Sequence, residues 1–364
     1  MSDTPTLPPR RGAAKKGTEP AKAGPKAAGA RGTRPSSGRV TLEDVAKLAG
    51  VSMMSVSRVV NRPESVTPEI REIVRKAISE TGYVPNLLAG GLASSKTKLV
   101  AAVVPTLTHV MFSHAIQSFS DRLAADGYQM LLGLSSYPTE REDSLVHAIL
   151  SRRPDALYLT GTSHSAETRR QLRAAKIPIV ETWDLSHKPI DMAVGFSHRA
   201  VGERLGEYLY GKGYRRIAVI SADDQRAMIR RDGVVSALAK LGVTDVTTVP
   251  TPAPSSLSMG RKVLGELVDQ GFRGAIHASS DAMAHGVLLE AQARGLSVPR
   301  DIAVIGFGDL DFAAYTSPPL STVRVDRFTV GRLAAEMLLK RLAGDPVSPK
   351  VVDVGFDIVE RATS

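Results

Sequence analysis

Residues 40–61, VTLEDVAKLAGVSMMSVSRVVN, contain two short helical patterns, and the second carries side chains suited to contact with nucleic acid. Small, flexible or polar residues stand where a solvated helix commonly has Glu or Lys, namely Ser52, Met53, Met54, Ser55, Ser57, Arg58 and Asn61. A helix that enters the DNA major groove needs such residues near its start, because they reach base edges and phosphates whereas a carboxylate repels the backbone. No acidic residue occurs from position 49 to position 63.

This pattern predicts a helix–turn–helix in which Met53, Met54 and Ser55 meet bases, while Ser57, Arg58 and Asn61 reach phosphates or further bases. A plain three-helix bundle with the methionines as core filler is the alternative.

Capping signals delimit three short helices around this segment. Thr41 begins a capping-box pattern and Gly50 is a C-cap candidate. Ser52 can cap the second helix. The third helix is predicted from TPE at 67–69, with proline at its first position, to Gly82.

From residue 99 onward the pattern changes to short apolar runs separated by helical stretches. The runs are LVAAVV, YQMLLGL, DALYLTG, IPIVET, MAVGF, RRIAVI, VTTV, GAIHAS, DIAVIGF, STVRV and VVDVGF. Alternation of strand and helix predicts parallel sheets covered by helices on both faces. Two such units fit into residues 99–364, and ligands of this architecture bind beyond the carboxyl ends of the strands, between the two lobes.

The charge of the 364-residue chain is unevenly distributed. The net charge is +10, but residues 1–39 hold nine Lys/Arg against Asp3 and Glu19. This Pro-, Ala- and Gly-rich tail has little to bury, so we expect it to be disordered, either as a solvated tail or as a basic arm that attracts phosphates. The chain has no cysteine, which excludes disulfides, thiolate catalysis and cysteine-ligated metals.

Motifs of catalysis and of membrane insertion are absent from the sequence. VVPTLTHVMF stands at the place of a G-x-G-x-x-G after the first strand, and no P-loop, G-x-S-x-G or H-E-x-x-H occurs. The eight histidines lack metal-ligand spacing. No apolar run approaches the roughly 18–20 residues of a membrane span. We therefore expect no catalytic residue, no metal, no cofactor and no membrane partner.

Several motifs together resemble a known family. V-T-L-x-D-V-A-x-x-A-G-V-S, V-S-R-V-x-N and the connector GYxPN resemble the DNA-binding headpiece of the lactose-repressor (LacI/GalR) family. SSDAMAHG, DIAVIGFGDLD and PPLSTVRVD resemble its sugar-binding core, so the resemblance covers residues 40–361. It implies an α/β protein with an N-terminal three-helix helix–turn–helix headpiece plus hinge, joined to two Rossmann-like lobes of the periplasmic-binding-protein type.

The expected domains are the disordered basic tail (1–39), the headpiece (40–84), a hinge helix and linker (85–98), and a two-lobed effector-binding and dimerisation domain (99–364). In the family the connector becomes a hinge helix that folds on the operator, and the position of Leu92 is a wedge in the minor groove. Gly90 and Gly91 stand where better helix formers are common, which raises the cost of ordering the hinge. An interdomain packing role for Leu92 is the alternative. The expected DNA-contacting residues are Thr41, Ser52, Met53, Met54, Ser55, Ser57, Arg58, Asn61, Asn86 and Leu92.

Shorter segments, TGTSHSAETRRQL, IPIVETWD, IDMAVGF and SPKVVDVGF, resemble the gluconate-utilisation repressor branch of the family. Gluconate, a polyol carboxylate, needs a cation, best an arginine, and several hydroxyl partners. By the resemblance Phe112, Arg230 and Asp281 are effector-binding residues. His164 and Trp183 are added to them because each follows a predicted strand of the first lobe, His164 near the mouth between the lobes, and Trp183 could stack on a sugar.

Each of these five residues also has an alternative, purely structural interpretation. Arg230 could be a surface helix arginine, Asp281 a helix N-cap and His164 a surface loop residue. Phe112 and Trp183, the only tryptophan, could be core aromatics.

Two departures from the family pattern bear on the ligand. Ser280 stands where many members have Asn, and Gly308 where many have Asp. The missing carboxylate at Gly308 removes a negative charge from the cleft, which favours an acid over a neutral sugar.

The resemblance implies a homodimeric transcriptional repressor in the bacterial cytoplasm, associated with the nucleoid. It would read a pseudo-palindromic operator in double-stranded DNA and be released by gluconate or a similar sugar acid. Control by a neutral or phosphorylated sugar, by a nucleobase or by a phosphoprotein corepressor is the alternative. A free periplasmic sugar-binding protein would share the core fold, but the headpiece and the missing signal peptide argue against it.

Overall fold

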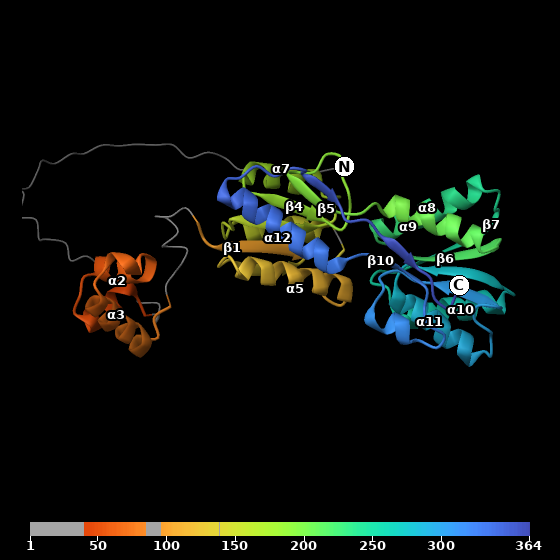
Figure 1. Ribbon diagram of the computed structural model, residues 1–364, viewed down its shortest axis with the longest axis horizontal. Coiled ribbons are helices and arrows are strands. Elements are labelled where there is room, and N and C mark those ends of the chain that lie inside the picture. The colour runs from red at the N-terminus through yellow and green to blue at the C-terminus, as the bar shows by residue number, and fades with distance from the viewer. Residues whose placement is uncertain (1–39, 85–95, 138) are drawn as a thin grey trace, which may run out of the picture. The chain divides into compact units, whose positions relative to one another are not determined.

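The computed structural model describes residues 40–84, 96–137 and 139–364, which divide into two compact units at residues 86 and 87 (Figure 1). Each unit is described here by itself. The predicted basic tail, the predicted hinge helix and the residues Asn86 and Leu92 lie outside the described residues.

The first unit contains three α-helices, α1 (Leu42–Ala49), α2 (Met53–Asn61) and α3 (Pro68–Thr81), with a short 3-10 helix, η1 (Pro63–Ser65), after α2. The predicted capping box is confirmed, because the Thr41 amide donates to Asp44 Oδ2 at 2.8 Å and the Asp44 amide donates to Thr41 Oγ1 at 3.3 Å. Gly50, at φ 63°, ends α1 in the left-handed region, and Ser52 accepts from the Ser55 amide at the start of α2. The helices enclose a small core: Val45, Ala46, Val56, Val59, Val74 and Ala77.

The second unit begins with lobe 1, a six-stranded parallel sheet in the order β11-β5-β4-β3-β1-β2. Its strands are β1 (Leu99–Val104), β2 (Gln129–Leu134), β3 (Ala156–Thr160), β4 (Ile179–Thr182), β5 (Met192–Gly195) and β11 (Val351–Asp353). Helices α5 (Val110–Ala124) and α12 (Arg327–Ala343) cover one face, and α6 (Thr139–Leu150) and α7 (Ala166–Ala175) cover the other. Because both faces are covered, β1 reads as a continuous apolar run: alternate residues, such as Val100 and Ala101, belong to opposite cores.

Lobe 2 repeats this plan with a four-stranded parallel sheet in the order β7-β6-β8-β9. Its strands are β6 (Arg216–Ala222), β7 (Asp245–Thr251), β8 (Gly274–Ala278) and β9 (Ile302–Ile305). Helices α8 (His198–Gly211) and α9 (Gln225–Lys240) pack on one face, and α10 (Leu257–Asp269) and α11 (Asp281–Ala293) pack on the other. The predicted fold class, two lobes of alternating strands and helices behind a three-helix headpiece, is confirmed.

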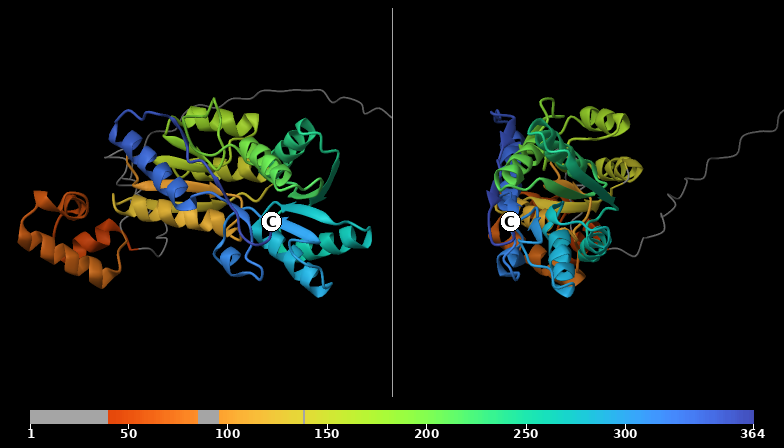
Figure 2. Two further views of the ribbon diagram at one scale, coloured as in Figure 1. Left: turned by 45° about the vertical axis from the view of Figure 1, so that its right-hand side comes forward. Right: turned by 90° about the vertical axis from the view of Figure 1, so that its right-hand side faces the viewer.

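Three segments cross between the lobes. The chain passes from β5 to α8, from β10 (Thr322–Arg324) to α12, and from β11 to β12 (Asp357–Val359). The antiparallel pair β10 and β12 lies at the junction of the lobes (Figure 2). One hydrophobic cluster near these crossovers contains residues of both lobes, such as Phe112 of α5 and Val234 of α9. The sequence patterns did not predict β12 or the short 3-10 helix η2 (Asp311–Tyr315).

No helix in the described ranges is both long and apolar enough to cross a membrane.

Candidate functional site

Helix α2 presents most of the predicted DNA-contacting side chains at the surface of the headpiece. Met53 is 54% exposed and Met54 is 63% exposed, so the alternative of methionine core filler is wrong. The buried side of α2 consists of Val56 and Val59 instead. The exposed side therefore offers flexible apolar side chains at the helix start, where base edges are reached.

The polar residues of α2 are arranged around these methionines. Ser52 and Ser55 share a hydrogen bond of 3.0 Å between their hydroxyls, and Asn61 donates to the Ser57 carbonyl at 2.9 Å. Arg58 is exposed, and no carboxylate of the described chain pairs with it. An exposed guanidinium on a helix that also carries serine hydroxyls is a suitable phosphate contact. Thr41 is exposed at the start of α1, where its hydroxyl also bonds Asp44.

A cavity of about 480 Å³ lies between the lobes of the second unit. It is lined by three of the five predicted effector residues, Phe112, Trp183 and Arg230. Sequence reasoning missed several others that line it: His109, Tyr137, His198, Asp224, Arg226, Ser279 and Phe307. They come from both lobes, so a ligand bound here touches both.

Arg230, on α9, is the central cation of this pocket. It is only 5% exposed, so the alternative of a surface arginine is wrong. Its Nη1 donates to His198 Nδ1 at 2.9 Å, its Nη2 donates to the Ser279 carbonyl at 3.3 Å, and the guanidinium lies 3.9 Å from the Phe307 ring centre. Its buried Nε has no hydrogen-bond partner, and no carboxylate of the described residues pairs with it.

Burial lowers the pKa of Arg230 to about 10, so the group is charged near neutral pH. A buried charge without a counterion is costly, because it loses hydration without gaining an ion pair. Asp224 and Asp184 favour the charged form of Arg230, but neither forms an ion pair with it.

His198 connects Arg230 to the crossover between β5 and α8. An arginine can only donate, so His198 Nδ1 is the acceptor and His198 Nε2 donates to the Trp183 carbonyl at 2.7 Å. Burial and the positive charge of Arg230 hold the pKa of His198 well below its usual value, so the ring is neutral. Both ring nitrogens are used, which makes His198 a support for Arg230 rather than a ligand contact.

The predicted aromatics both pack and line the pocket. Phe112 and Trp183 meet edge to face with centroids 5.3 Å apart, and Trp183 Nε1 donates to the Tyr158 hydroxyl at 3.2 Å. Trp183 is 2% exposed and stands at φ 67°, in the left-handed region. Phe112 and Trp183 therefore both line the pocket and pack in the core.

A second arginine reaches the same pocket from the start of α9. The guanidinium of Arg226 lies 5.3 Å from the Phe112 ring centre and its Nε lies 3.9 Å from Asp224 Oδ1. Asp224 is also the N-cap of α9, with its Oδ1 accepting from the amides of Arg226 and Ala227. A signal existed in SADDQRAMIRR, since residues that begin a helix after a strand lie at the ligand edge of such sheets.

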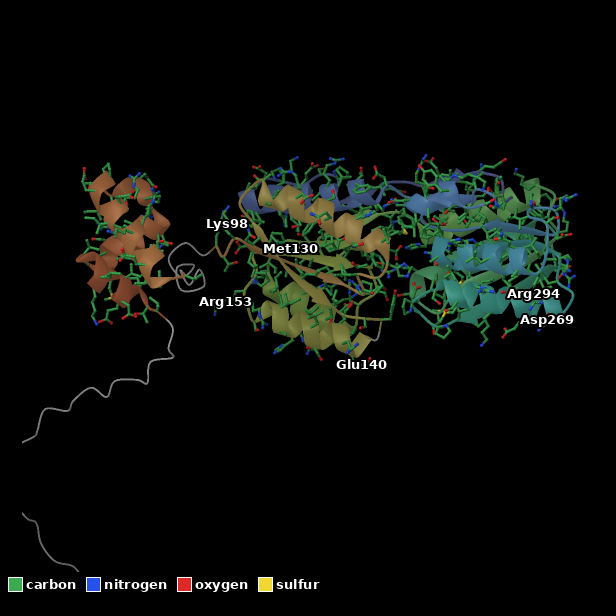
Figure 3. All side chains as sticks on the ribbon, turned by 90° about the horizontal axis from the view of Figure 1, so that it is seen from below. Lys98, Met130, Glu140, Arg153, Asp269 and Arg294 are labelled. Carbon is green, nitrogen blue, oxygen red and sulfur yellow. The ribbon has the colours of Figure 1, made fainter. Side chains whose placement is uncertain are left out.

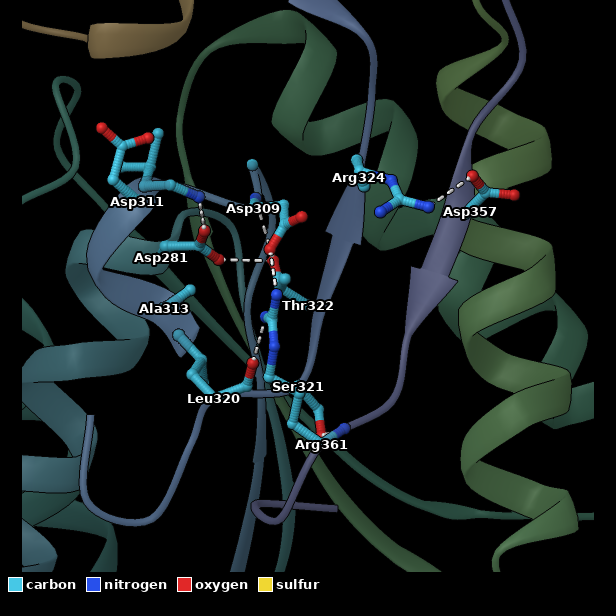
Figure 4. Close-up of polar contacts among 12 residues, drawn as sticks. Asp281, Asp309, Asp311, Ala313, Leu320, Ser321, Thr322, Arg324, Asp357 and Arg361 are labelled. Carbon is cyan, nitrogen blue, oxygen red and sulfur yellow. Dashed lines mark hydrogen bonds and ion pairs between the residues drawn. The ribbon is translucent and has the colours of Figure 1, made fainter. Parts of the chain in front are cut away.

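Asp281 does not line the pocket, and our expectation of a cleft-facing carboxylate is wrong. The residue is fully buried, with Oδ2 accepting from the Leu310 amide at 2.7 Å and Oδ1 accepting from the Thr322 hydroxyl at 2.5 Å (Figure 4). The N-cap alternative is also wrong, because Ser280 caps α11 by accepting from the Met283 amide. Burial raises the pKa of Asp281 to about 6. Its role is to tie α11 to β10.

The two residues that depart from the family pattern, Ser280 and Gly308, differ in their position relative to the pocket. Ser280 lines the pocket, beside Ser279. Gly308 is not among the lining residues and has φ 136°, where a side chain is strained, and an added Cβ would lie 3.1 Å from Met111 Sδ. A residue with a side chain at 308 would therefore require a different local backbone.

His164 lies away from the pocket, inside lobe 1. Its side chain is fully buried, so the surface-loop alternative is wrong too. Nδ1 lies 2.5 Å from Glu142 Oε1 and Nε2 lies 3.5 Å from Glu181 Oε1. Burial alone would lower the pKa of His164, but hydrogen bonds and charge from both glutamates outweigh it and raise the pKa to about 9. The imidazolium links α6, β4 and the loop before α7.

This buried ion cluster predicts a pH dependence of stability. The folded-state pKa of about 9 lies above the ordinary histidine pKa of 6.5, so the stabilisation is fully present below pH 6.5 and is lost as pH rises through 9. We expect the thermal midpoint to fall more steeply between these pH values in the unmodified protein than in His164→Gln. Calorimetry with His147→Gln, an exposed histidine of α6, as control measures this. Parallel pH curves for the unmodified protein and His164→Gln would contradict the assignment.

Comparison with known proteins gives matches to both units. Residues 41–86 match the family model described as bacterial regulatory proteins, lacI family, and residues 207–364 match a periplasmic binding protein-like domain. The HTH-type transcriptional regulator GntR of Pseudomonas aeruginosa is 37% identical over 90% of this chain and 97% of its own length. The regulator of the same name in Escherichia coli K12 is 32% identical over 88% of this chain and 97% of its own length.

Solved structures agree with these relatives. A LacI-family transcriptional regulator from Silicibacter pomeroyi has a TM-score of 0.84 at 32% identity, covering 89% of this chain and 99% of that one. The lac repressor dimer bound to operator and an anti-inducer has a TM-score of 0.75 at 26% identity, with the same coverage of 89% and 99%.

Proposed function

The chain belongs to the lacI family of bacterial regulatory proteins and is a transcriptional repressor rather than an enzyme, and on this basis we propose that its controlling ligand is a sugar acid, gluconate. The ligand would bind in the pocket between the lobes and release the repressor from its operator. Phe112, Trp183 and Arg230 are the contacts we retain from the sequence, and Arg226 and Ser280 are added from the pocket.

The observation that carries this proposal is the buried Arg230 guanidinium, which has an unpartnered Nε and no carboxylate partner among the described residues. With Arg226 beside it and Asp224 as the acid of the lining, and with His198 neutral, the pocket has an excess of one positive charge. A ligand with one carboxylate would neutralise it. Its hydroxyls would meet Ser279, Ser280 and Tyr137, in a volume suited to a small molecule.

The names of the relatives support the same ligand class. Two regulators named GntR and one named IdnR are among the relatives of this chain. The regulator named IdnR is 29% identical over 88% of this chain and 97% of its own length. The transcriptional repressors named PurR and CytR are 29% and 28% identical, against 37% and 32% for the two regulators named GntR.

For the DNA side we propose that two copies of the chain bind one pseudo-palindromic operator, as the lac repressor dimer binds its operator. Each copy would place α2 in the major groove, with Met53, Met54 and Ser55 at base edges. Ser57, Arg58 and Asn61 would contact phosphates or further bases, with Ser52 and Thr41 at the flanking helix starts. Asn86 and Leu92 stay predictions from the resemblance.

Coupling between pocket and DNA would run through the crossovers. A ligand whose carboxylate contacts Arg230 in lobe 2, and whose other groups contact Phe112 and Tyr137 in lobe 1, would favour one width of the cleft. His198, at the start of α8, joins Arg230 to the first crossover. The ligand can change operator affinity only by its differential affinity for the two lobe arrangements, and such couplings are typically about 1–3 kcal/mol.

The test is operator binding measured by fluorescence anisotropy, with DNA from upstream of this gene and its neighbours, in the presence and absence of millimolar gluconate. We expect release by gluconate and no release by glucose or ribose. Tight operator binding that gluconate does not change would rule out gluconate as the effector. The search would then turn to phosphorylated or neutral sugars, nucleobases and corepressors. Release by glucose as effective as release by gluconate would contradict the role of the pocket's positive charge.

A further inference from the structure

The end of lobe 1 away from the pocket carries a group of exposed cations. In a parallel sheet the loops that lead into the strands lie at one edge, here the segments before β1, β3 and β4. They place Lys96, Arg152, Arg153 and Lys176 around one groove, and Figure 3 shows Lys98 and Arg153 at the same end of the lobe. These five residues, all exposed, form what we call the basal patch.

The groove beside the basal patch has few acidic residues. Asp155 is the one carboxylate among the residues that line the groove. It accepts hydrogen bonds from the amides of Thr97 and Lys98, both at 2.8 Å, and so it holds the chain that enters β1. Within the described residues, Arg152, Arg153 and Lys176 form no ion pair.

The described part of the second unit carries a small positive excess. Residues 96–364 contain 32 Lys/Arg and 29 Asp/Glu. Outside the basal patch and Asp155, 27 Lys/Arg are matched by 28 Asp/Glu. The four patch cations that line the groove lie together at one end of lobe 1.

The headpiece itself has no such excess. Residues 40–84 contain six Lys/Arg and six Asp/Glu, so their net charge is zero even though α2 has no acidic residue. DNA carries one negative charge per about 1.7 Å of duplex, and most of the affinity of DNA-binding proteins that depends on salt comes from cations placed near phosphates. Cations outside the headpiece would add the attraction to phosphates that the uncharged headpiece lacks.

We propose that the basal patch is a second DNA-contacting surface, which binds phosphates of the duplex that α2 reads. The patch lies where the chain leaves lobe 1 toward the headpiece, and Asp155 holds that exit beside Arg152 and Arg153. Eleven residues, 85–95, separate the described parts, and a tether of this length spans at most about 40 Å. A headpiece bound to its operator therefore keeps the patch within this reach of the same DNA molecule.

The experiment compares three full-length proteins on one operator duplex without effector, at salt concentrations from about 50 to 200 mM. The test variant is Arg152→Gln, Arg153→Asn and Lys176→Asn. Asparagine is chosen for the last two because both residues have a left-handed backbone, at φ 51° and 54°, which Asn tolerates. The control variant is Arg204→Gln, Lys240→Gln and Lys262→Gln, which removes the same charge from exposed positions of lobe 2.

For each phosphate contact that is lost, the slope of log affinity against log salt becomes shallower by about 0.9. We expect the test variant to lose one or more such contacts and roughly tenfold in affinity at the lowest salt, and the control variant to behave like the unmodified protein. An unchanged slope in the test variant, or an equal change in the control, overturns the proposal. So does a test variant that keeps operator affinity but fails to repress in the cell, because that result assigns the patch to another partner. The assay contains no ligand, so it does not depend on gluconate.

Discussion

Arg230→Ala is expected to give a repressor that binds its operator normally but no longer responds to gluconate. The gluconate concentration needed for half release should rise by about a hundredfold or more, because a buried charge-assisted contact to a carboxylate is typically worth 2–5 kcal/mol. Operator affinity without effector should change little, since Arg230 belongs to the second unit and α2 to the first. Anisotropy titrations of both DNA and gluconate measure the two quantities.

Arg231→Ala is the matched control for this experiment. Arg231 is the next residue of α9, but its side chain pairs with Asp232 at 2.7 Å and does not line the pocket. If loss of the Arg230 side chain harms folding, Arg230→Met keeps its length and its packing against Phe307 while removing the charge. Normal release of either Arg230 variant by gluconate would show that the anion binds elsewhere.

The second large effect is expected for Met54→Glu on α2. The side chain is 63% exposed, so the substitution leaves the core of Val56 and Val59 intact. A carboxylate at the start of the helix replaces an adaptable base contact by repulsion from the phosphates, and a good base contact is worth about 1–3 kcal/mol before the repulsion is added. We expect operator affinity to fall by about a hundredfold or more, with an unchanged unfolding temperature.

Ile73→Glu provides the comparison for this variant. Ile73 is 49% exposed on α3, so the control adds the same charge to the same unit at similar exposure. A general effect of net charge would weaken both variants equally, whereas the proposed role of α2 requires a much larger loss for Met54→Glu. Equal losses in the two variants would contradict that role.

Local signals in the sequence predicted most of the fold. The capping box at Thr41, the left-handed Gly50 and the cap at Ser52 are interactions between residues close in the chain, and each is present. The apolar runs predicted the strands of both parallel sheets, because a strand that is covered on both faces is a continuous run of apolar residues. The strand β12 (Asp357–Val359) is harder to predict from the sequence, since it has only three residues and forms by pairing with β10.

The ligand site was predicted only in part, for a physical reason. Resemblance and position after a strand identified Phe112, Trp183 and Arg230, which line the pocket. The same reasoning failed for His164 and Asp281, whose side chains turn into buried contacts within one lobe. Position after a strand places a residue at the correct edge of the sheet, but the direction of its side chain depends on partners far away in sequence.

The sequence by itself therefore determined the elements, their order and the family of the protein, because periodicity, caps and motifs act over a few residues. Only the tertiary structure decided the chemistry of the pocket. The contact from Arg230 through His198 to the Trp183 carbonyl joins residues of three separate segments. The cations of the basal patch are likewise brought together by loops that precede different strands. The local charge of the pocket and of the patch depends on which side chains come together after folding. Burial then determines whether a charged side chain needs an ion-pair partner from outside the protein.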